Sequence, residues 1–241
     1  MSFFISWMKT RIVIASIIFV FPIYASRSSG EITSPVDGIC QADIVKTSGH
    51  QCQEFEVKTE DGYILSLQRI TNGSATTSEL RRIPVLIQHG LFMDGMSWML
   101  NSPEESLPLI LAGEGYDVWI GNIRGTKWSR RHERLSSSSK EYWNWSWDEL
   151  KEYDFPTTVE FVSAQTGQPK IHYIGHSLGT LVAIASFSEG KMVKKFLSTV
   201  LLSPIGYLDH MTSPLIAFAA KAFVGDAMKL MGMAEFNPKI M

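Results

Sequence analysis

A serine flanked by glycines, in the run Gly175-His176-Ser177-Leu178-Gly179, is the residue of this sequence best suited to nucleophilic chemistry. Residues 170–174 before it have the character of a strand, and the apolar residues after it recur at helical spacing. A strand, a sharp turn and a helix would lift the Ser177 hydroxyl above the sheet edge, and the glycines would let strand and helix approach closely. The pattern predicts a serine nucleophile; the alternative is a glycine-rich turn whose serine has no chemical role.

Such a nucleophile needs backbone N–H groups directed at the negative charge that develops on the substrate oxygen. One donor normally belongs to the residue after the serine, here Leu178, and the other to the loop after an earlier strand. The run His89-Gly90-Leu91 follows a short apolar segment, so we expect the N–H of Leu91 to be the second donor. A plain tight turn at His89-Gly90 is the alternative.

Alternating apolar segments are expected to position these residues. A hairpin over residues 54–69 should turn at Glu60-Asp61-Gly62 and place Phe55, Val57, Leu65 and Leu67 inside. Further strands are expected at 85–87, 116–120, 171–174 and 199–203, and helices at 106–113, 155–166 and up to about Gly190. Strands that alternate with helices predict an α/β fold, with a mostly parallel sheet covered by helices on both faces.

Seven short runs then occur in a characteristic order: His89-Gly90-Leu91, Gly115-Tyr116-Asp117-Val118-Trp119, Gly121-Asn122-Ile123-Arg124-Gly125, Trp128-Ser129-Arg130-Arg131-His132, Trp147-Asp148-Glu149, Tyr153-Asp154 and Gly175-His176-Ser177. From about Val36 to the end, the chain resembles the acid lipase family of the α/β-hydrolases, which includes gastric lipase, lysosomal acid lipase and plant triacylglycerol lipases. The resemblance implies hydrolysis of neutral lipid esters, triacylglycerols or steryl esters, through an acyl-serine at Ser177. It also implies Leu91 and Leu178 as oxyanion donors, and neither a metal nor an organic cofactor.

Other features of these runs are expected to be structural. Residues 124–134 are interpreted as a largely structural and solvated stretch rather than a lipid headgroup site, and Trp143, Trp145 and Trp147 as packing residues. Leu178 stands where animal members of the family often have glutamine. Because the oxyanion contact uses the backbone, this difference should not disable the site.

The family fold continues through a cap and two strands that carry an acid and then a histidine. After Ser177 this sequence has only His210 as histidine and only Asp209 and Asp226 as aspartates. Asp209 and His210 are neighbours, which rarely align as acid, base and nucleophile, and the side chain of His176 should point away from Ser177. We therefore expect a C-terminally truncated lipase domain at 27–241, whose cap begins at about 205 and whose last strands are missing.

That expectation leaves other functions open. The chain could be a catalytically inactive lipase fragment or a lipid-binding pseudoenzyme, or it could be an esterase or acyltransferase acting on smaller esters. Residues 214–231 have helical periodicity and favour a helix packed on the body or, alternatively, a lid that transiently contacts a lipid surface. With a net charge of -2 the chain has no overall basic field, so nucleic acid is not an expected partner.

The N-terminus predicts entry into the secretory pathway. Residues 1–26 have the order of a signal peptide, with basic residues, a short apolar run and small residues, although an uncleaved anchor is the alternative. The expected location is therefore extracellular or in an endomembrane lumen such as a lysosome or vacuole. In that setting Cys40 and Cys52 should form a disulfide rather than remain as thiols. Sequons begin at Asn72 and Asn144, of which the first is the better glycosylation candidate.

Overall fold

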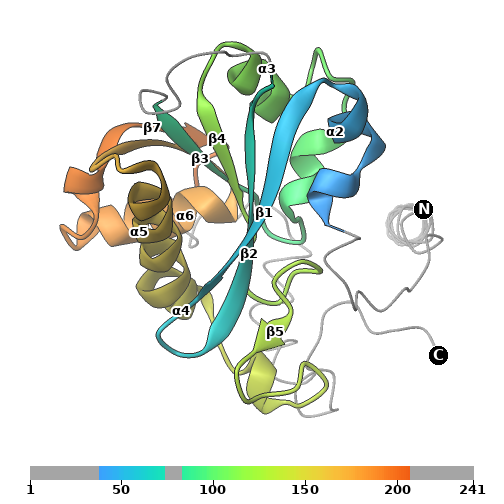
Figure 1. Ribbon diagram of the computed structural model, residues 1–241. Coiled ribbons are helices and arrows are strands. Elements are labelled where there is room, and N and C mark those ends of the chain that lie inside the picture. Colours follow the sequence, from blue (N-terminus) through green and yellow to red (C-terminus); the bar gives the residue numbers. More distant parts are fainter. Residues whose placement is uncertain (1–37, 74–82, 207–241) are drawn as a thin grey trace, which may run out of the picture. The chain divides into compact units, whose positions relative to one another are not determined.

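The computed structural model describes residues 38–73 and 83–206 (Figure 1). The predicted signal peptide, the helix expected at 214–231, and Asp209, His210 and Asp226 lie outside the described residues, as does most of the expected cap. Within the described ranges, no helix combines the length and apolar character that crossing a membrane requires.

The centre of the described region is a seven-stranded sheet with the order β1-β2-β4-β3-β6-β7, in which the short β5 (Arg131–His132) pairs with β2. β1 (His50–Lys58) and β2 (Tyr63–Asn72) are antiparallel, and β2 is antiparallel to β4 (Asp117–Gly121). β3 (Pro84–Gln88), β4, β6 (Ile171–His176) and β7 (Phe196–Leu202) are parallel neighbours. The expected strands and the mostly parallel α/β architecture are confirmed.

The opening hairpin has the predicted turn and the predicted inner face. Phe55 pairs with Leu67 and Val57 with Leu65, so the four residues lie on one side of the two strands. Leu65 and Leu67 are buried, and Phe55 and Val57 pack partly buried against the same core. The strands extend beyond the predicted 54–69 at both ends.

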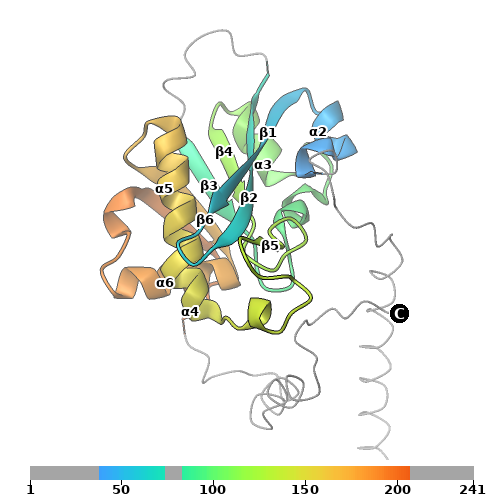
Figure 2. The same ribbon diagram turned by 60° about the horizontal axis from the view of Figure 1, so that its bottom comes forward.

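Helices cover both faces of the sheet, as Figures 1 and 2 show from two directions. On one face lie α5 (Phe155–Thr166) and α6 (Leu178–Ser188), preceded by α4 (Trp147–Glu149) and the π-helix η6 (Leu150–Asp154). On the other lie α2 (Asp43–Thr47) and α3 (Leu107–Gly113). Four short 3-10 helices complete the described part: η2 (Ile39–Gln41), η4 (Gly95–Met99), η5 (Glu141–Trp143) and η7 (Val193–Lys195).

The two layers have separate cores because successive side chains of a strand point to opposite faces. On β4, Trp119 joins the cluster that includes Val159 of α5, whereas Val118 and Ile120 join the cluster that includes Leu109 of α3. Because helices cover both faces of the sheet, the central strands β3 and β4 are buried at every position. This burial is also why their sequence shows a continuous apolar run rather than an alternation.

Arg124 departs from the prediction that residues 124–134 are solvated. It is 1% exposed and forms ion pairs with Asp61, in the hairpin turn, and Asp154, at the end of η6. Its guanidinium also lies 3.9 Å from the centre of the Tyr63 ring. The structural role of Arg124 is confirmed. Its charge can be buried because two carboxylates and an aromatic ring take the place of the hydrating water molecules.

Candidate active site

Ser177 lies in a sharp turn between β6 and α6, the arrangement that the glycine-serine-glycine pattern predicts. Its backbone has φ +50° and ψ -109°, a conformation that costs energy in any residue except glycine. The N–H of Ser177 donates to the carbonyl of Leu202 at 3.0 Å, and its carbonyl accepts from Thr180 and Leu181 at 2.9 and 3.2 Å. The end of β7 and the first turn of α6 therefore hold the strained backbone in place.

The two flanking glycines are required by the close packing of strand and helix. A Cβ at Gly179 would lie 3.0 Å from the carbonyl oxygen of Gln88, on the neighbouring strand. A Cβ at Gly175 would lie 2.8 Å from the ring of Tyr173 and 3.0 Å from the backbone of Gly179. Both contacts are shorter than ordinary van der Waals separations, so α6 could not pack this close to β3 with larger residues.

The loop after β3 lies directly against Ser177. A Cβ at Gly90 would lie 3.1 Å from Cβ of Ser177 and 2.8 Å from Nδ1 of His176. Leu91 is the next residue after Gly90, and Leu178 directly follows Ser177 at the start of α6. Within residues 38–73 and 83–206, neither of their backbone N–H groups has a hydrogen-bond acceptor, which is what an oxyanion site requires before substrate binds.

His89 fixes the beginning of this loop as a neutral imidazole. Its Nδ1 contacts the carbonyl of Gly90 at 2.9 Å, and its Nε2 accepts the N–H of Ile123 at 3.3 Å. These contacts assign the proton to Nδ1. Burial lowers the pKa of His89 to about 4, so the ring stays neutral over most of the acidic range. Sequence reasoning treated His89-Gly90 as an oxyanion loop or a plain turn and missed this second role of the histidine.

A buried carboxylate lies behind the turn. Asp154 lines a small, partly open space together with Gln88, Ile123, Leu178 and other residues of α6 and η6. Burial raises its pKa to about 6, although Arg124 counteracts this by charge and hydrogen bonds. The Asp154 carboxylate accepts hydrogen bonds from the backbone N–H of Arg124 at 2.9 Å and from its Nε at 2.7 Å. These bonds give Asp154 a structural role.

The described part of the chain contains no base bonded to Ser177. His176 precedes the serine, and its ring lies edge-on to Trp98 at 6.3 Å between ring centres. The candidates Asp209, His210 and Asp226 lie outside the described residues. Within residues 38–73 and 83–206, no three His, Cys, Asp or Glu side chains are grouped so as to hold a metal ion.

The tip of the loop after β3 is apolar and exposed. Leu91, Phe92 and Met93 have 55%, 70% and 44% of their surface exposed, and Phe92 has a positive φ of 60°. The following carboxylate, Asp94, turns inward and accepts the N–H of Met96 at 2.8 Å. The side of the site next to Leu91 is therefore an apolar surface, to which an uncharged substrate could bind without desolvating a charge.

The fold and the serine turn agree with the comparison with known families. Residues 83–228 match the family described as the alpha/beta hydrolase fold, and residues 41–102 match the partial alpha/beta-hydrolase lipase region. The chain therefore belongs to the α/β-hydrolase fold family.

Its curated relatives are lipases, which confirms the resemblance to the acid lipases. Triacylglycerol lipase 2 of Arabidopsis thaliana is 52% identical over 205 residues, which are 84% of this chain and 49% of that protein. Gastric triacylglycerol lipase of Rattus norvegicus is 44% identical, with 69% of this chain and 43% of the relative covered. Human lysosomal acid lipase/cholesteryl ester hydrolase is 38% identical, with 81% and 50% covered. The chain thus spans about half the length of the curated relatives it matches.

Solved structures support the fold. The esterase Pf2001 of Pyrococcus furiosus superposes with a TM-score of 0.51 at 25% identity, covering 76% of this chain and 61% of that structure. The hypothetical protein PA2218 of Pseudomonas aeruginosa reaches 0.54 at 15% identity, covering 84% and 59%. The second similarity, at such low identity, concerns the fold alone.

Proposed function

We propose that this chain carries the nucleophile and oxyanion site of a lipase-type carboxylic ester hydrolase that acts on neutral lipids, triacylglycerols or steryl esters. The observation that carries the proposal is Ser177 in a strained strand-to-helix turn, with the N–H of Leu178 and the loop of Leu91 beside it. The lipase relatives support the substrate class.

In the proposed reaction the Ser177 oxygen forms a bond to the ester carbonyl carbon and gives its proton to a base. The carbonyl oxygen becomes negative and is stabilised by the N–H groups of Leu91 and Leu178. When the tetrahedral intermediate collapses, the alcohol leaves with a proton and the acyl group remains on the serine. Water then releases the fatty acid by the reverse sequence of bond changes. The base would be supplied by residues outside the described ranges.

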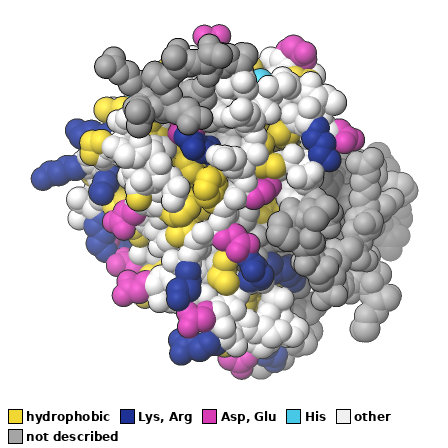
Figure 3. Space-filling view, in the orientation of Figure 1, with side chains coloured by type: hydrophobic (Ala, Val, Ile, Leu, Met, Phe, Trp, Pro, Cys, Tyr) yellow, Lys and Arg dark blue, Asp and Glu magenta, His cyan; other side chains and the backbone are white. Residues whose placement is uncertain are grey.

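Surface composition supports an uncharged substrate. The proposed oxyanion donor Leu91 and the two residues that follow it, Phe92 and Met93, have apolar, exposed side chains. On the face that Figure 3 shows, the basic and acidic side chains of the described residues are interspersed, which gives a polyanion little to bind. A cap after residue 205 would add a second lipid contact.

Entry into the secretory pathway, through a signal peptide at 1–26, is part of the proposal. The structure joins Cys40 and Cys52 in a disulfide, with Cα atoms 5.4 Å apart, and such bonds persist in oxidising compartments. The extracellular space and a lysosomal or vacuolar lumen both fit. Glycosylation is a further proposal: Asn144 is exposed, whereas the half-buried Asn72 donates to the carbonyl of Gly113 at 3.4 Å.

The test is reaction of the folded chain with a fluorophosphonate probe. Labelling should occur in the wild type and disappear in Ser177→Ala. It should persist in Ser186→Ala, which removes a different, buried hydroxyl from the same helix. A folded chain that is not labelled, or equal labelling of Ser177→Ala, would favour the inactive fragment or lipid-binding protein. A chain-length series of esters then separates a lipase from an esterase, because only a lipase should prefer long acyl chains.

A further inference from the structure

The oxyanion loop, residues 89–95, is anchored at both ends by the segment that follows β4. At its start, Nε2 of His89 accepts the N–H of Ile123 at 3.3 Å. At its end, the N–H of Gly95 donates to Oδ1 of Asn122 at 2.8 Å. Between the anchors, the described contacts within the loop include one backbone bond, from Met93 to Gly90 at 3.4 Å. These two anchors hold both ends of the segment that contains Leu91.

The Asn122 side chain is oriented by three hydrogen bonds. It is 2% exposed, and its Nδ2 donates to Oε1 of Gln68 at 2.8 Å and to the carbonyl of Ser66 at 3.1 Å. Rotating the amide by half a turn would place its oxygen against two oxygens and its nitrogen against the Gly95 N–H. The amide thus has one acceptable orientation, and its oxygen is held towards the loop.

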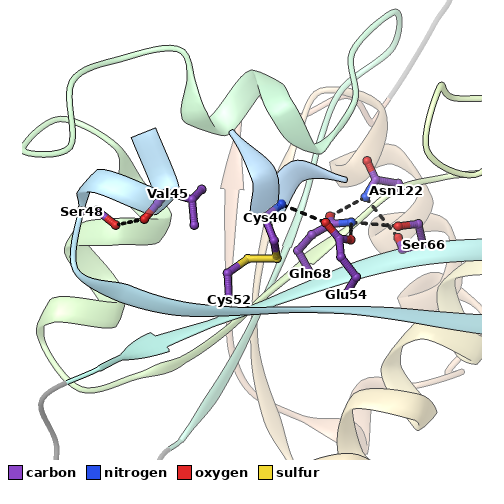
Figure 4. The surroundings of a disulfide bond; sticks show 8 residues. All are labelled: Cys40, Val45, Ser48, Cys52, Glu54, Ser66, Gln68 and Asn122. Atoms are coloured by element: carbon purple, nitrogen blue, oxygen red, sulfur yellow. Dashed lines mark hydrogen bonds between the residues drawn. A yellow bond between two sulfur atoms is a disulfide. The ribbon is translucent and has the colours of Figure 1, made fainter. Parts of the chain in front are cut away.

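A chain of hydrogen bonds extends from the buried Asn122 and Gln68 to the half-buried Glu54 and Cys40 beside the disulfide, as Figure 4 shows. Gln68 donates through Nε2 to the Glu54 carboxylate, and the other oxygen of Glu54 accepts the backbone N–H of Cys40 at 2.9 Å. The disulfide to Cys52 ties Cys40 to β1. Asn122 and Gln68 are the buried members of this chain, so displacing Gln68 removes the acceptor of one Asn122 N–H inside the protein.

Close packing at Gly95 restricts the loop further. A Cβ at this position would lie 2.7 Å from Ile120 and 2.9 Å from Oδ1 of Asn122. The loop backbone is therefore pressed against the end of β4, where it can reach the Asn122 amide. Because this contact is tight, we expect a shift of the Asn122 side-chain amide to move the loop backbone as well.

We propose that Asn122 is a positioning residue of the oxyanion site, and that Gln68 and Glu54 link it to the Cys40–Cys52 disulfide. Its function is to hold the loop so that the N–H of Leu91 faces the oxygen of the reacting ester. The inference rests on the proposed function for its catalytic meaning, whereas the anchoring itself can be measured without turnover.

The first test is amide hydrogen exchange in Asn122→Ala. Gly95 loses its own acceptor and must exchange faster, so the informative amides are Met93 and Ile123, which do not bond Asn122. Both should exchange about tenfold faster, the effect of losing roughly one hydrogen bond, while the amides of α5 stay unchanged. Faster exchange at Gly95 alone would overturn the proposal.

The second readout is the rate of fluorophosphonate labelling at Ser177. Asn122→Ala should lower the maximal labelling rate by about tenfold, with little change in the probe concentration that gives half the maximal rate. Asn122→Asp keeps the oxygen that accepts from Gly95 and, when protonated, can donate to Gln68. The maximal labelling rate of Asn122→Asp, relative to that of the wild type at the same pH, should therefore rise as the pH falls. A maximal rate unchanged in Asn122→Ala would overturn the positioning role.

Two further variants separate positioning from loss of stability. Asp117→Asn weakens the bidentate pair with Arg69 at the opposite end of β4, so it should lower the melting temperature without affecting Met93 or Ile123. Gln68→Met removes the next link and should speed exchange in the loop even though Gln68 does not touch it. If Asn122→Ala does not fold, this variant decides. Loosened amides without labelling in any protein would support the anchor and refute the proposed function.

Discussion

His89 makes a specific prediction about the stability of the fold in acid. The imidazole is 1% exposed, and burial lowers its pKa from an ordinary value of 6.5 to about 4. In the unfolded chain the ring binds a proton near pH 6.5, whereas in the folded protein it stays neutral until about pH 4. His89 therefore contributes stability that is present above pH 6.5 and is lost as the pH falls towards 4.

The size of the effect follows from the two pKa values. Each pKa unit corresponds to about 1.36 kcal/mol, so the stability lost between pH 6.5 and 4 is about 3 kcal/mol. In a chain of this size such a loss corresponds to a decrease in melting temperature of about 6–12 °C. Asp154 opposes it: burial raises its pKa from 3.8 to about 6, so its contribution is present at low pH and lost as the pH rises through 6. The wild-type profile should therefore be flatter than His89 alone would make it.

The comparison of wild type with His89→Gln isolates the histidine, because Asp154 is common to both proteins. Glutamine can still accept the N–H of Ile123, but it does not titrate and does not reproduce the contact with Gly90. At neutral pH the variant should be less stable by about 1 kcal/mol, the value of one hydrogen bond. As the pH falls to about 4, the wild type should lose about 3 kcal/mol relative to the variant. Urea unfolding at several pH values measures the free energy of unfolding of both proteins. If the two free energies change in parallel with pH, the buried neutral state of His89 is refuted.

Two other predictions concern packing and the disulfide. Gly179→Ala should destabilise the fold by about 1–3 kcal/mol, because its Cβ would lie 3.0 Å from the Gln88 carbonyl. Gly206→Ala, where a Cβ would meet no atom of the described residues within 4 Å, should be neutral. Equal free energies of unfolding in urea for the two variants would contradict this packing. Replacing Cys40 and Cys52 by alanine should lower the free energy of unfolding by about 3 kcal/mol in the chain-entropy model. The melting temperature of the double variant should match that of the reduced wild type. A larger drop on reduction of the wild type would contradict this account of the disulfide.

Much of the fold could be predicted because its signals are local. The apolar runs at 84–88 and 117–121 are buried strands, and α5 begins and ends at the predicted residues 155 and 166. The turn at Ser177 could be predicted from its flanking glycines, at which a Cβ would come too close to neighbouring atoms. This signal is confined to a few adjacent residues. Periodicity and glycine placement thus carry information that needs no knowledge of distant partners.

The interactions behind the turn could not be predicted because they join distant residues. Arg124 lies in a run of basic residues, and only the fold shows that Asp61 and Asp154 come from two other segments to neutralise it. Asn122 has no signal of its own in the sequence, since an asparagine after a strand is ordinary in a loop. Its three hydrogen bonds depend on the register of β2 beside β4.

The run Gly121-Asn122-Ile123-Arg124-Gly125 of the lipase-like pattern contains no reacting group, but its residues make several long-range contacts. Three consecutive residues bond two other segments: Asn122 bonds Gly95 at the end of the 89–95 loop, Ile123 bonds His89 at its start, and Arg124 bonds Asp154 before α5. The segment after β4 thereby links the loop of Leu91 to the residue that precedes α5. Oxyanion stabilisation depends on placing donors before the charge appears, so under the proposed function residues 122–124 should matter for catalysis although none of them reacts.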